Sequence, residues 1–454
     1  MKTIRIHKGR DIVIPGVAEK TVCTIPATGS YAVKPTDWVG VQPRLLVNEG
    51  DRVLAGSPLF EDKGNPGVPF PSPVSGTVRS IARGEKRSLQ AVVVEANDTQ
   101  QHLSYPICNP MESDAPTLRH RLISSGLWTL LRQRPFGTVP APDATPKAVF
   151  ISAFDSSPLP VDYDFMLRER REDFQYGVNA LQRIAGNIHL SLNGRHQQDS
   201  FFTGISGADI HFFDGPHPAG LVGTHISAID PINKGETVWT VNPQDVAIIG
   251  HLLRTGEYLP ERMVAFCGPM VKNPCYLKAL AGCQISVFQD CCILNNSSDR
   301  ARYICGSVLS GTSVAADGFL CSSTDKVCLL PEGNRYDFLG WLRPNWHKFS
   351  FSRTFLSGFF KKNNPTSFTS HLQYDTGMHG DRRPLFVTGE FEKLVPIDIL
   401  PMQLIKACIV GDIERMEELG IYEVEPEDLA LCEFADTSKT EIQDIIRRGL
   451  ERFR

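Results

Sequence analysis

The 454-residue sequence has twelve cysteines but no Cys-x-x-Cys pair. Zinc and iron–sulfur sites usually use that short spacing, so the sequence indicates neither. Cys267, Cys275, Cys283 and Cys291 recur every eight residues, but glycine, proline and turns lie between them, which suits no ligand set. We expect buried, reduced cysteines that act as small apolar residues. We expect no disulfides, because no secretion signal is evident.

Long apolar runs and a strong excess of one charge are also missing. No stretch approaches the ~18 apolar residues of a membrane-spanning helix, so we expect no transmembrane segment in this chain. The start, MKTIRIHKGRDIVIPG, has no apolar segment of signal-peptide length, which favours a cytoplasmic chain. The net charge is −4 and no long block of Lys or Arg occurs, which argues against nucleic-acid binding.

Motifs for nucleotide binding and for common hydrolytic chemistry are absent from the sequence. It has no Gly-x-x-x-x-Gly-Lys-Ser/Thr, no Gly-x-Gly-x-x-Gly after a predicted strand, no Gly-x-Ser-x-Gly and no His-Glu-x-x-His. The nearest stretch is the Gly-rich turn at residues 215–223, where two prolines remove N–H donors that a phosphate would need. A tight structural turn is the favoured interpretation, and a ligand-binding edge is the alternative.

Three histidines, His211, His217 and His225, lie around that turn. Their spacings of six and eight residues do not fit a metal-binding pair on one helix. We therefore expect them to pack or to form hydrogen bonds rather than to bind a metal.

The periodicity of the sequence changes along the chain and predicts an α/β multidomain protein. Residues 1–107 contain two predicted pairs of strands with a similar spacing of strands and turns. This pattern predicts a small β sandwich. Residues 115–256 alternate strands with amphipathic helices, as in a parallel α/β domain. Residues 257–335 return to short strands, 336–378 form an irregular aromatic connector, and 379–454 have helical apolar spacing.

Lys63 lies in the turn of LFEDKGNPGVPFPSPVSGTV, between two predicted strands. Lipoyl and biotin carriers display their modified lysine on such a hairpin, and Glu61-Asp62-Lys63 echoes the lipoyl pattern. The connection is about two residues longer than in lipoyl domains, and hairpin geometry depends on loop length. An ordinary surface lysine is the favoured interpretation. A stand-alone lipoyl- or biotin-type carrier that uses Lys63 is the alternative.

Two loops combine aromatic residues with prolines. LRQRPFGTVP places Arg132 and Arg134 close to Phe136, and KPTDWVGVQP places Trp38 between two prolines, where it looks exposed. Aromatic rings beside arginine can hold a flat polar headgroup or anchor a protein interface. Local packing of surface loops is the competing interpretation.

Stretches that run in order over nearly the whole chain resemble the A subunit of the bacterial Na+-translocating NADH:quinone oxidoreductase (Na+-NQR). The most specific are GPHPAGLVGTH and DILPMQLIKACIVGD, and VNEGDRVLAGSPLFEDKGNPGVPF and SGLWTLLRQRPFGTVP are further examples. The resemblance implies a biotinyl/lipoyl-like β domain at 1–107, a Rossmann-like α/β domain at 115–256, a β-grasp (SLBB-like) module at 257–335 and a helical domain at 379–454. It also implies a fold like that of the flavin- and iron–sulfur-bearing subunit of complex I and of the C subunit of the related electron-transport complex.

Those relatives carry cofactors at two places where this sequence departs from them. Their glycine-dense flavin loop corresponds to SGLWT at 125–129, which has bulky residues instead. Cys408 and Cys432 stand alone, and Ala435 stands where the A subunit usually has another cysteine. We therefore expect a chain that binds no cofactor and has no complete active site. A chain that keeps a flavin or an iron–sulfur cluster is the alternative.

The resemblance implies a role in a membrane complex that passes electrons from NADH through flavins and iron–sulfur centres in other subunits to ubiquinone and moves Na+ outward. This chain would lie on the cytoplasmic face of the bacterial membrane, dock on the membrane subunits, especially the B subunit, and help to form the quinone-reducing end, with ubiquinone at that interface. The residues expected at the quinone headgroup, with the histidines as a weaker choice, are Trp38, Arg132, Arg134, Phe136, His217 and His225.

Overall fold

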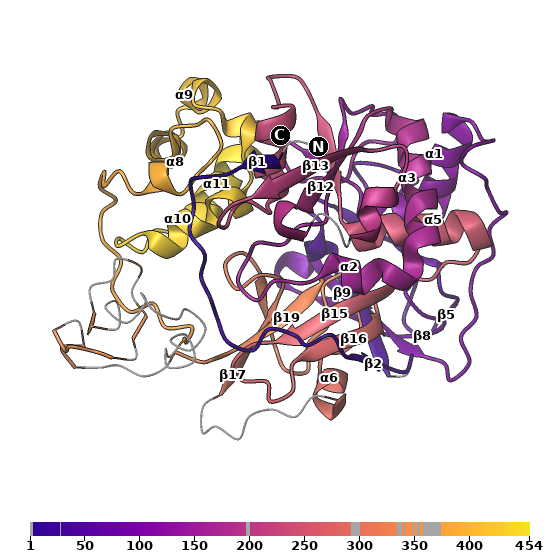
Figure 1. The fold of residues 1–454 in the computed structure, drawn as a ribbon. Coiled ribbons are helices and arrows are strands. Elements are labelled where there is room, and N and C mark those ends of the chain that lie inside the picture. The colour runs from indigo at the N-terminus through magenta and orange to yellow at the C-terminus, as the bar shows by residue number, and fades with distance from the viewer. Residues whose placement is uncertain are drawn as a thin grey trace.

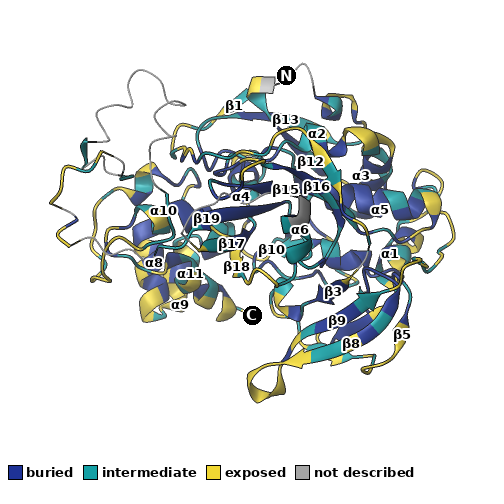
Figure 2. Ribbon diagram, turned by 90° about the horizontal axis from the view of Figure 1, so that it is seen from below, coloured by how far each residue is buried: buried dark blue, intermediate teal, exposed yellow. Residues whose placement is uncertain are grey.

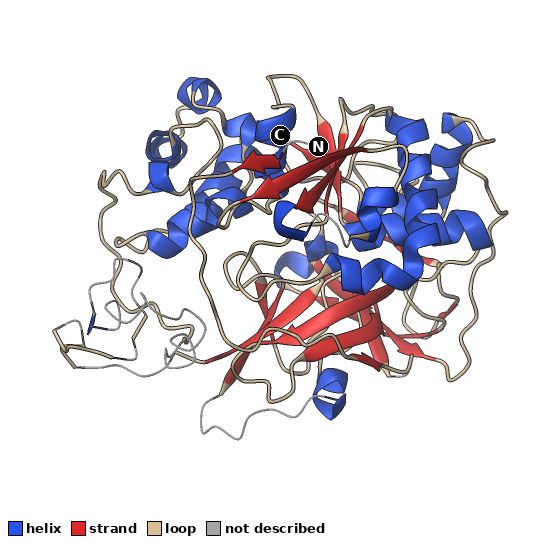
Figure 3. Cartoon of the chain, in the orientation of Figure 1, coloured by secondary structure: helices blue, strands red, loops and turns tan. Residues whose placement is uncertain are grey.

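The computed structural model describes residues 3–27, 29–196, 200–291, 300–333, 338–340, 342–346, 348–349, 351, 355–356 and 374–454. Within these residues the chain forms four β-sheets, with helices grouped around one sheet and at the C-terminal end (Figures 1 and 3). Most of the connector predicted at 336–378 lies outside the described residues. None of the described helices is both long enough and apolar enough to cross a membrane.

Two small antiparallel sheets build the N-terminal β sandwich. One sheet contains, in pairing order, β3 (Ser30–Val33), β9 (Leu89–Ala96), β8 (Gly76–Arg83) and β5 (Arg52–Val53). The other contains β4 (Pro43–Leu45), β6 (Pro58–Asp62) and β7 (Pro69–Pro71). Phe60 and Phe70 stack between neighbouring strands with ring centroids 4.7 Å apart, and both are fully buried. The two predicted strand pairs are therefore present.

The first two strands of the chain lie outside this sandwich, which differs from the domain predicted at 1–107. β1 (Thr3–Arg5) pairs in parallel with β13 (Asp209–Asp214), and β2 (Val22–Thr24) pairs in parallel with β16 (Cys275–Leu280). The segment between them runs along the molecule (indigo in Figure 1). Each strand has only three residues, so its own sequence carries too little periodicity to indicate its partner.

A six-stranded sheet forms the α/β part of the chain, with the order β1-β13-β12-β11-β14-β10. Its remaining strands are β10 (Arg132–Arg134), β11 (Val149–Ser152), β12 (Ile188–Asn193) and β14 (Val238–Val241). All pairs are parallel except β10 with β14 at the edge. The strand order reverses between β11 and β14, and in such sheets ligands bind outside the carboxyl ends of the strands at that point.

Five helices accompany this sheet: α1 (Ala115–Ser124), α2 (Tyr163–Leu167), α3 (Arg171–Ala185), α4 (Val222–Ile229) and α5 (Pro243–Thr255). Their ends follow from local residues. Asp114 and Asn242 accept hydrogen bonds from backbone N–H groups at the starts of α1 and α5, and Gly256 ends α5 in a left-handed conformation.

Helices α3 and α5 cross at two glycines. A Cβ atom on Gly177 would lie 2.0 Å from the carbonyl oxygen of Val246, and a Cβ on Gly250 would lie 1.7 Å from that of Asp173. Glycine inside a helix costs about 1 kcal/mol relative to alanine. The close approach of the two backbones offsets that cost by burying the apolar faces of both helices.

The third part of the chain is a mixed sheet with the order β18-β17-β19-β15-β16-β2. Its own strands are β15 (Glu261–Cys267), β16, β17 (Ala301–Cys305), β18 (Thr312–Val314) and β19 (Lys326–Pro331), and α6 (Ser286–Cys291) follows β16. Alternating short strands were expected here, and the central ones bury Phe266, Val327 and Leu329.

Four helices complete the chain: α8 (Pro401–Val410), α9 (Ile413–Glu418), α10 (Ala430–Ala435) and α11 (Ile442–Glu451). The helical spacing predicted over 379–454 is therefore present. The apolar faces of these helices share one core with Ile304 and Leu330 of the third sheet and with Ile12 of the N-terminal segment.

The ten cysteines that the structure describes are all free thiols. Eight are buried, and Cys23 and Cys321 are half-buried. The expectation of reduced, mostly buried cysteines is met for these ten.

Candidate functional site at the domain junctions

The crevice at the carboxyl ends of β11 and β14 contains side chains of the chain itself. Asp325, directly before β19, accepts hydrogen bonds from Tyr163 Oη at 2.7 Å and from the amide of Asn242, which follows β14. Gln244 Nε2 also donates to Asp325, at 2.7 Å, and the buried guanidinium of Arg262 lies 3.4 Å away. One carboxylate from the third sheet thus occupies the position where doubly wound proteins usually bind a ligand.

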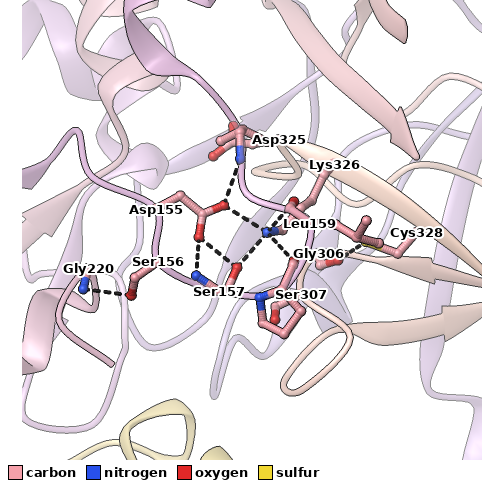
Figure 4. Close-up of polar contacts among 12 residues, drawn as sticks. Asp155, Ser156, Ser157, Leu159, Gly220, Gly306, Ser307, Asp325, Lys326 and Cys328 are labelled. Atoms are coloured by element: carbon pink, nitrogen blue, oxygen red, sulfur yellow. Dashed lines mark hydrogen bonds and ion pairs between the residues drawn. The ribbon is translucent and has the colours of Figure 1, made fainter. Parts of the chain in front are cut away.

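Next to it, a buried lysine joins the α/β sheet to the third sheet (Figure 4). Lys326 Nζ donates to Asp155 Oδ2 at 2.7 Å, to Ser157 Oγ at 2.5 Å and to the carbonyl oxygen of Leu159 at 3.1 Å. Asp155 in turn accepts from the backbone and hydroxyl of Ser157, at 2.8 and 2.6 Å. Asp155 and its neighbours follow β11, whereas Lys326 begins β19.

The charge state of this cluster excludes a serine nucleophile. Burial alone would raise the pKa of Asp155, but the Lys326 ammonium and the hydrogen bonds lower it overall. Burial lowers the pKa of Lys326, but the Asp155 carboxylate, its hydrogen bond and the nearby Cys328 and Cys267 thiols together raise it above its usual value. Lys326 therefore stays protonated and cannot accept a proton from Ser157, as an activating base would. The cluster is a clamp between two sheets.

The Gly-rich turn at 215–223 packs against another part of the chain. Gly220 N–H donates to Ser156 Oγ at 2.8 Å, and α4 begins within this stretch, at Val222. A Cβ on Gly223, in the first turn of α4, would lie only 2.2 Å from Asp428 Oδ1. An anion is favoured at such a helix start. Here the chain supplies its own carboxylate, which supports the structural interpretation of the turn.

Arg134 holds that carboxylate, so it does not lie on a surface loop as the sequence suggested. Its buried guanidinium donates to Asp428 Oδ2 at 2.8 Å and to Glu427 Oε1 at 2.5 Å, and Glu425 lies 3.8 Å away. Phe136 packs edge-on against Tyr422, with ring centroids 6.4 Å apart. Both residues fasten the C-terminal helices to the α/β sheet.

His217 and His225 are both buried and have polar partners within the chain, in line with the expectation that they pack or form hydrogen bonds. His225 Nε2 lies 2.8 Å from the carbonyl oxygen of Ala219, and burial lowers the pKa of His225 to about 3. His217 Nδ1 lies 3.1 Å from Ser156 Oγ, and burial lowers the pKa of His217 to about 4. Both rings are therefore neutral near pH 7, and their contacts stabilise the Gly-rich turn from the protein interior.

Trp38 is also buried rather than exposed. Its Nε1 donates to the carbonyl oxygen of Thr129 at 2.9 Å, and its ring meets Phe70 edge-on at 4.7 Å. Arg132 lies close by, because its guanidinium donates to the carbonyl oxygen of Asp37 at 3.0 Å. Of the six predicted residues, the structure thus brings Trp38 and Arg132 together on one side, and places the others around the C-terminal helices and the Gly-rich turn.

Trp38 borders an apolar cavity of about 50 Å³. The cavity lies where the sandwich, the α/β part and the third sheet meet, and its walls include Val33, Trp38, Pro71, Leu127, Tyr258 and Gly282. It has room for small molecules of the size of water but not for a quinone ring without movement of its walls. Sequence reasoning missed the cavity, because its walls come from distant segments that share no local pattern.

Lys63 is exposed in the turn after β6. Its backbone N–H donates to the carbonyl oxygen of Gln42 at 2.8 Å. The neighbouring carboxylate of Asp62 accepts from the N–H groups of Gln42 and Gly64, at 2.9 and 3.1 Å. The turn is fixed by these bonds, while the lysine side chain meets solvent.

Comparison with known families gives matches to three domain models. Residues 4–97 match the NqrA N-terminal barrel-sandwich hybrid domain. Residues 113–258 match the NqrA second alpha/beta domain, and residues 263–316 match the NQRA C-terminal domain.

Several curated proteins are similar over the full length, and each is the A subunit of a Na(+)-translocating NADH-quinone reductase. The protein of Actinobacillus succinogenes is 38% identical over 452 residues, which cover 99% of each chain. The protein of Histophilus somni strain 2336 is 38% identical over 454 residues, which cover 99% of each chain. The protein of Yersinia pseudotuberculosis is 37% identical over 452 residues, which cover 98% of each chain.

Among solved structures, the NAD+-reducing NiFe-hydrogenase is similar in its air-oxidized state, with a TM-score of 0.35 and 11% identity over 76% of this chain and 65% of the other. Its H2-reduced state gives a TM-score of 0.37 and 11% identity over 78% and 68%. These scores are too low to support an argument. The domain models and the full-length identities are decisive, and they show that the chain belongs to the A-subunit family of the Na+-translocating NADH-quinone reductase.

Proposed function

We propose that this chain docks on the membrane subunits of its reductase complex, above all on the B subunit, at the cytoplasmic face of the membrane. The observation that carries the proposal is an apolar patch at the junction of α8 and α9. Its residues are Ile409, Val410 and Ile413, which are 51%, 77% and 47% exposed. We call these three residues the α8–α9 patch.

The patch differs from scattered surface apolar residues, because its members lie within five consecutive positions. Helix α8 already buries Leu404, Ile405 and Cys408 in the C-terminal core, so the patch presents a second apolar face to solvent. Figure 2 shows the exposed colour on α8 and α9 at the edge of the molecule. Exposed apolar patches of this kind mark contacts with proteins or membranes.

The paired substitution Val410→Asp and Ile413→Asp tests the docking. We expect the variant chain to fold but to be lost from the complex when membranes are washed and purified, because two carboxylates would have to be desolvated at the interface. The matched control is Leu46→Asp, an equally exposed apolar residue in the sandwich. Normal recovery of the chain with both patch substitutions would refute docking through this patch.

We also propose that Trp38 and Arg132 contribute to the quinone-reducing end. Trp38 lines the apolar cavity described above, and Arg132 is bonded to its neighbour Asp37. An aromatic wall beside a guanidinium suits a quinone ring with polar oxygens, and the walls of the cavity would move apart to admit the ring. Trp38→Leu in the assembled complex should raise the quinone KM with little loss of assembly. A KM unchanged by Trp38→Leu would rule out the headgroup role.

The other four residues predicted at the headgroup, Arg134, Phe136, His217 and His225, would act on quinone only through the folding of the parts they join. Each of them contacts the C-terminal helices or the Gly-rich turn within this chain. Their substitution should therefore change the recovery of the folded chain rather than the quinone KM alone.

The chemistry of NADH, flavin, iron–sulfur centres and ubiquinone would then lie in other subunits or at their interfaces. The self-filled crevice around Asp325 and the separate burial of Cys408 and Cys432 support a chain that binds no flavin or cluster. The visible absorbance of the purified chain tests this, because a bound flavin or cluster would give absorption bands.

We further propose that the N-terminal sandwich is biotinyl/lipoyl-like, the α/β part Rossmann-like and the third part β-grasp (SLBB-like). These folds would be like those of the flavin- and iron–sulfur-bearing subunit of complex I.

A further inference from the structure

Lys34, Cys305 and Cys321 meet at the seam between the sandwich and the third sheet. Lys34 follows β3 and its Nζ donates to Cys321 Sγ at 3.3 Å and to the carbonyl oxygen of Phe319 at 3.1 Å. Cys305 ends β17, and the interaction of its thiol with the Cys321 sulfur lowers the pKa of Cys321. A cationic donor and a neighbouring thiol therefore converge on one sulfur atom.

The two cysteines differ in access to solvent. Cys305 is 4% exposed, whereas Cys321 is half-buried and lies in the loop before β19. A small reagent from solvent thus reaches Cys321 more readily than Cys305. Redox-sensing proteins often have such a pair, in which an accessible cysteine is oxidised to a sulfenic acid and a second cysteine then forms a disulfide with it.

The electrostatics around Cys321 favour its thiolate. The hydrogen bond from Cys305 and the charge of Lys34 lower the pKa of Cys321, against the opposing effects of burial and of the Asp37 carboxylate. Asp37 is 3.5 Å from Lys34 and also accepts from the backbone N–H of Ser322 at 2.8 Å. Thiolates, rather than thiols, react with oxidants and alkylating reagents.

Two other cysteine pairs in the same sheet serve as internal comparisons. Cys23 is half-buried beside Cys275 like Cys321 beside Cys305, but burial and the Cys275 thiol raise its pKa. Cys267 and Cys328 have sulfur atoms 3.7 Å apart, but both are fully buried. Among the described cysteines, only Cys321 combines access, a lysine donor and a neighbouring thiol.

We propose that Cys321 is a peroxide-reactive thiol of this protein and that Cys305 is its resolving partner. The Cys321 thiolate attacks one oxygen of a hydroperoxide and forms a sulfenic acid, while the O–O bond breaks and the other oxygen leaves as water or an alcohol after taking up a proton. The Cys305 sulfur then attacks the sulfenic sulfur, loses its proton and releases water. The two thiols are oxidised by two electrons to a disulfide, and the peroxide is reduced.

Oxidation at this place would affect the neighbouring cavity. The disulfide changes the sulfur that Lys34 contacts across the seam, and Ser322, the next residue after Cys321, lines the cavity with Trp38. The inference is independent of the proposed docking and quinone contact, because it concerns only groups within this chain.

Alkylation of the full chain by iodoacetamide tests the reactivity of Cys321, with peptide mass spectrometry as the readout. The pKa of Cys321 is lowered and that of Cys23 is raised, so at pH 7 we expect Cys321 to have the larger thiolate fraction and to react faster than Cys23. Lys34→Met should slow Cys321 and leave Cys23 unchanged. Equal rates at Cys321 and Cys23 in the unaltered chain would overturn the proposal, and this comparison does not depend on the folding of any variant.

Treatment with a small excess of hydrogen peroxide tests the second step. We expect a Cys305–Cys321 disulfide, seen as a linked peptide pair that dithiothreitol separates. In Cys305→Ser the sulfenic acid at Cys321 should instead be trapped by dimedone, whereas Cys328→Ser should behave like the unaltered chain. Absence of the Cys305–Cys321 link, or its formation at the same rate as a Cys23–Cys275 link, would contradict the assignment.

Discussion

Arg134 and Asp428 are 294 residues apart in the sequence, yet their side chains form a 2.8 Å ion pair in which both groups are almost completely buried. The arginine ends the edge strand β10, and the aspartate precedes α10. Glu425 and Glu427 approach the same guanidinium, at 3.8 and 2.5 Å. A single arginine therefore faces three carboxylates and fixes the C-terminal helices against the α/β sheet.

The first prediction concerns the loss of this arginine. Arg134→Met would leave buried carboxylates without a counter-charge, which typically costs about 3–5 kcal/mol in the free energy of unfolding. Urea denaturation of the purified chain measures the loss. Limited proteolysis should also cut the C-terminal segment sooner, because its main anchor is gone.

The matched control for Arg134→Met is Arg448→Met, which breaks an exposed pair with Asp444 on α11. Exposed pairs of this kind contribute about 0–1 kcal/mol. The double substitution Arg134→Met with Asp428→Leu should recover part of the loss, since the most deeply buried of the three carboxylates is then removed together with its counter-charge. Equal losses from Arg134→Met and Arg448→Met would contradict the role assigned to the cluster.

The position of Arg134 shows which features of this protein the sequence could not predict. The motif LRQRPFGTVP drew attention to Arg134 and Phe136, but the acidic partners of Arg134 lie in and next to PEDL, far along the chain, and no local pattern connects them. Trp38 was misplaced for the same reason, because its hydrogen-bond partner Thr129 lies in a distant segment. The apolar cavity, formed by separate segments, had no signal at all.

Helices and strands with strong local periodicity were predicted much better than contacts between distant segments. Helical apolar spacing was predicted over 379–454, and there Ile442, Ile446 and Leu450 form the buried face of α11. Strands alternating with amphipathic helices were predicted over 115–256, which includes strand β11 and helix α3. The three-residue strands β1 and β2 had no prediction of their own, because long-range pairing alone determines their place outside the sandwich.

The second prediction is a loss of stability in mild acid caused by His225. Burial lowers the folded-state pKa of His225 to about 3, whereas a histidine in the unfolded chain titrates near pH ~6.5. Between these values only the unfolded chain takes up the proton, so this contribution to stability is complete above about pH 6.5 and is lost as pH falls toward 3. The loss amounts to about 1.4 kcal/mol per pH unit.

The measurement is the free energy of unfolding in urea at about pH 7 and about pH 5, which lie above and within the window of that loss. His225→Gln keeps a donor for the carbonyl of Ala219 but cannot take up a proton, so its stability should fall less between the two pH values than that of the unaltered chain. His120→Gln, at an exposed position of α1, is the control and should leave the fall unchanged. An identical fall in all three proteins would show that His225 does not titrate on unfolding.

The third prediction is a loss of stability at a position where helix propensity alone would predict a gain. Gly250→Ala should destabilise the chain by about 1–3 kcal/mol, the usual cost of overpacking, although alanine is the better helix former. The new Cβ would lie 1.7 Å from the carbonyl oxygen of Asp173, so α3 and α5 would have to separate. Thermal or urea unfolding measures the loss, and Glu172→Ala on the exposed side of α3 should change stability by less than about 0.5 kcal/mol. A Gly250→Ala chain as stable as the unaltered one would mean that the helices can separate without loss of packing.

The last prediction concerns Lys63 and the carrier alternative. The longer turn after β6 is fixed by Asp62, which accepts from the N–H groups of Gln42 and Gly64, so the lysine is not presented on the tight hairpin that the modifying ligases recognise. We expect the intact mass of the chain to stay unchanged after co-expression with lipoyl and biotin ligases, while a lipoyl domain expressed beside it gains the lipoyl mass. A mass increase that disappears in Lys63→Arg would establish the carrier role instead. A mass increase that persists in Lys63→Arg would show that another lysine is modified.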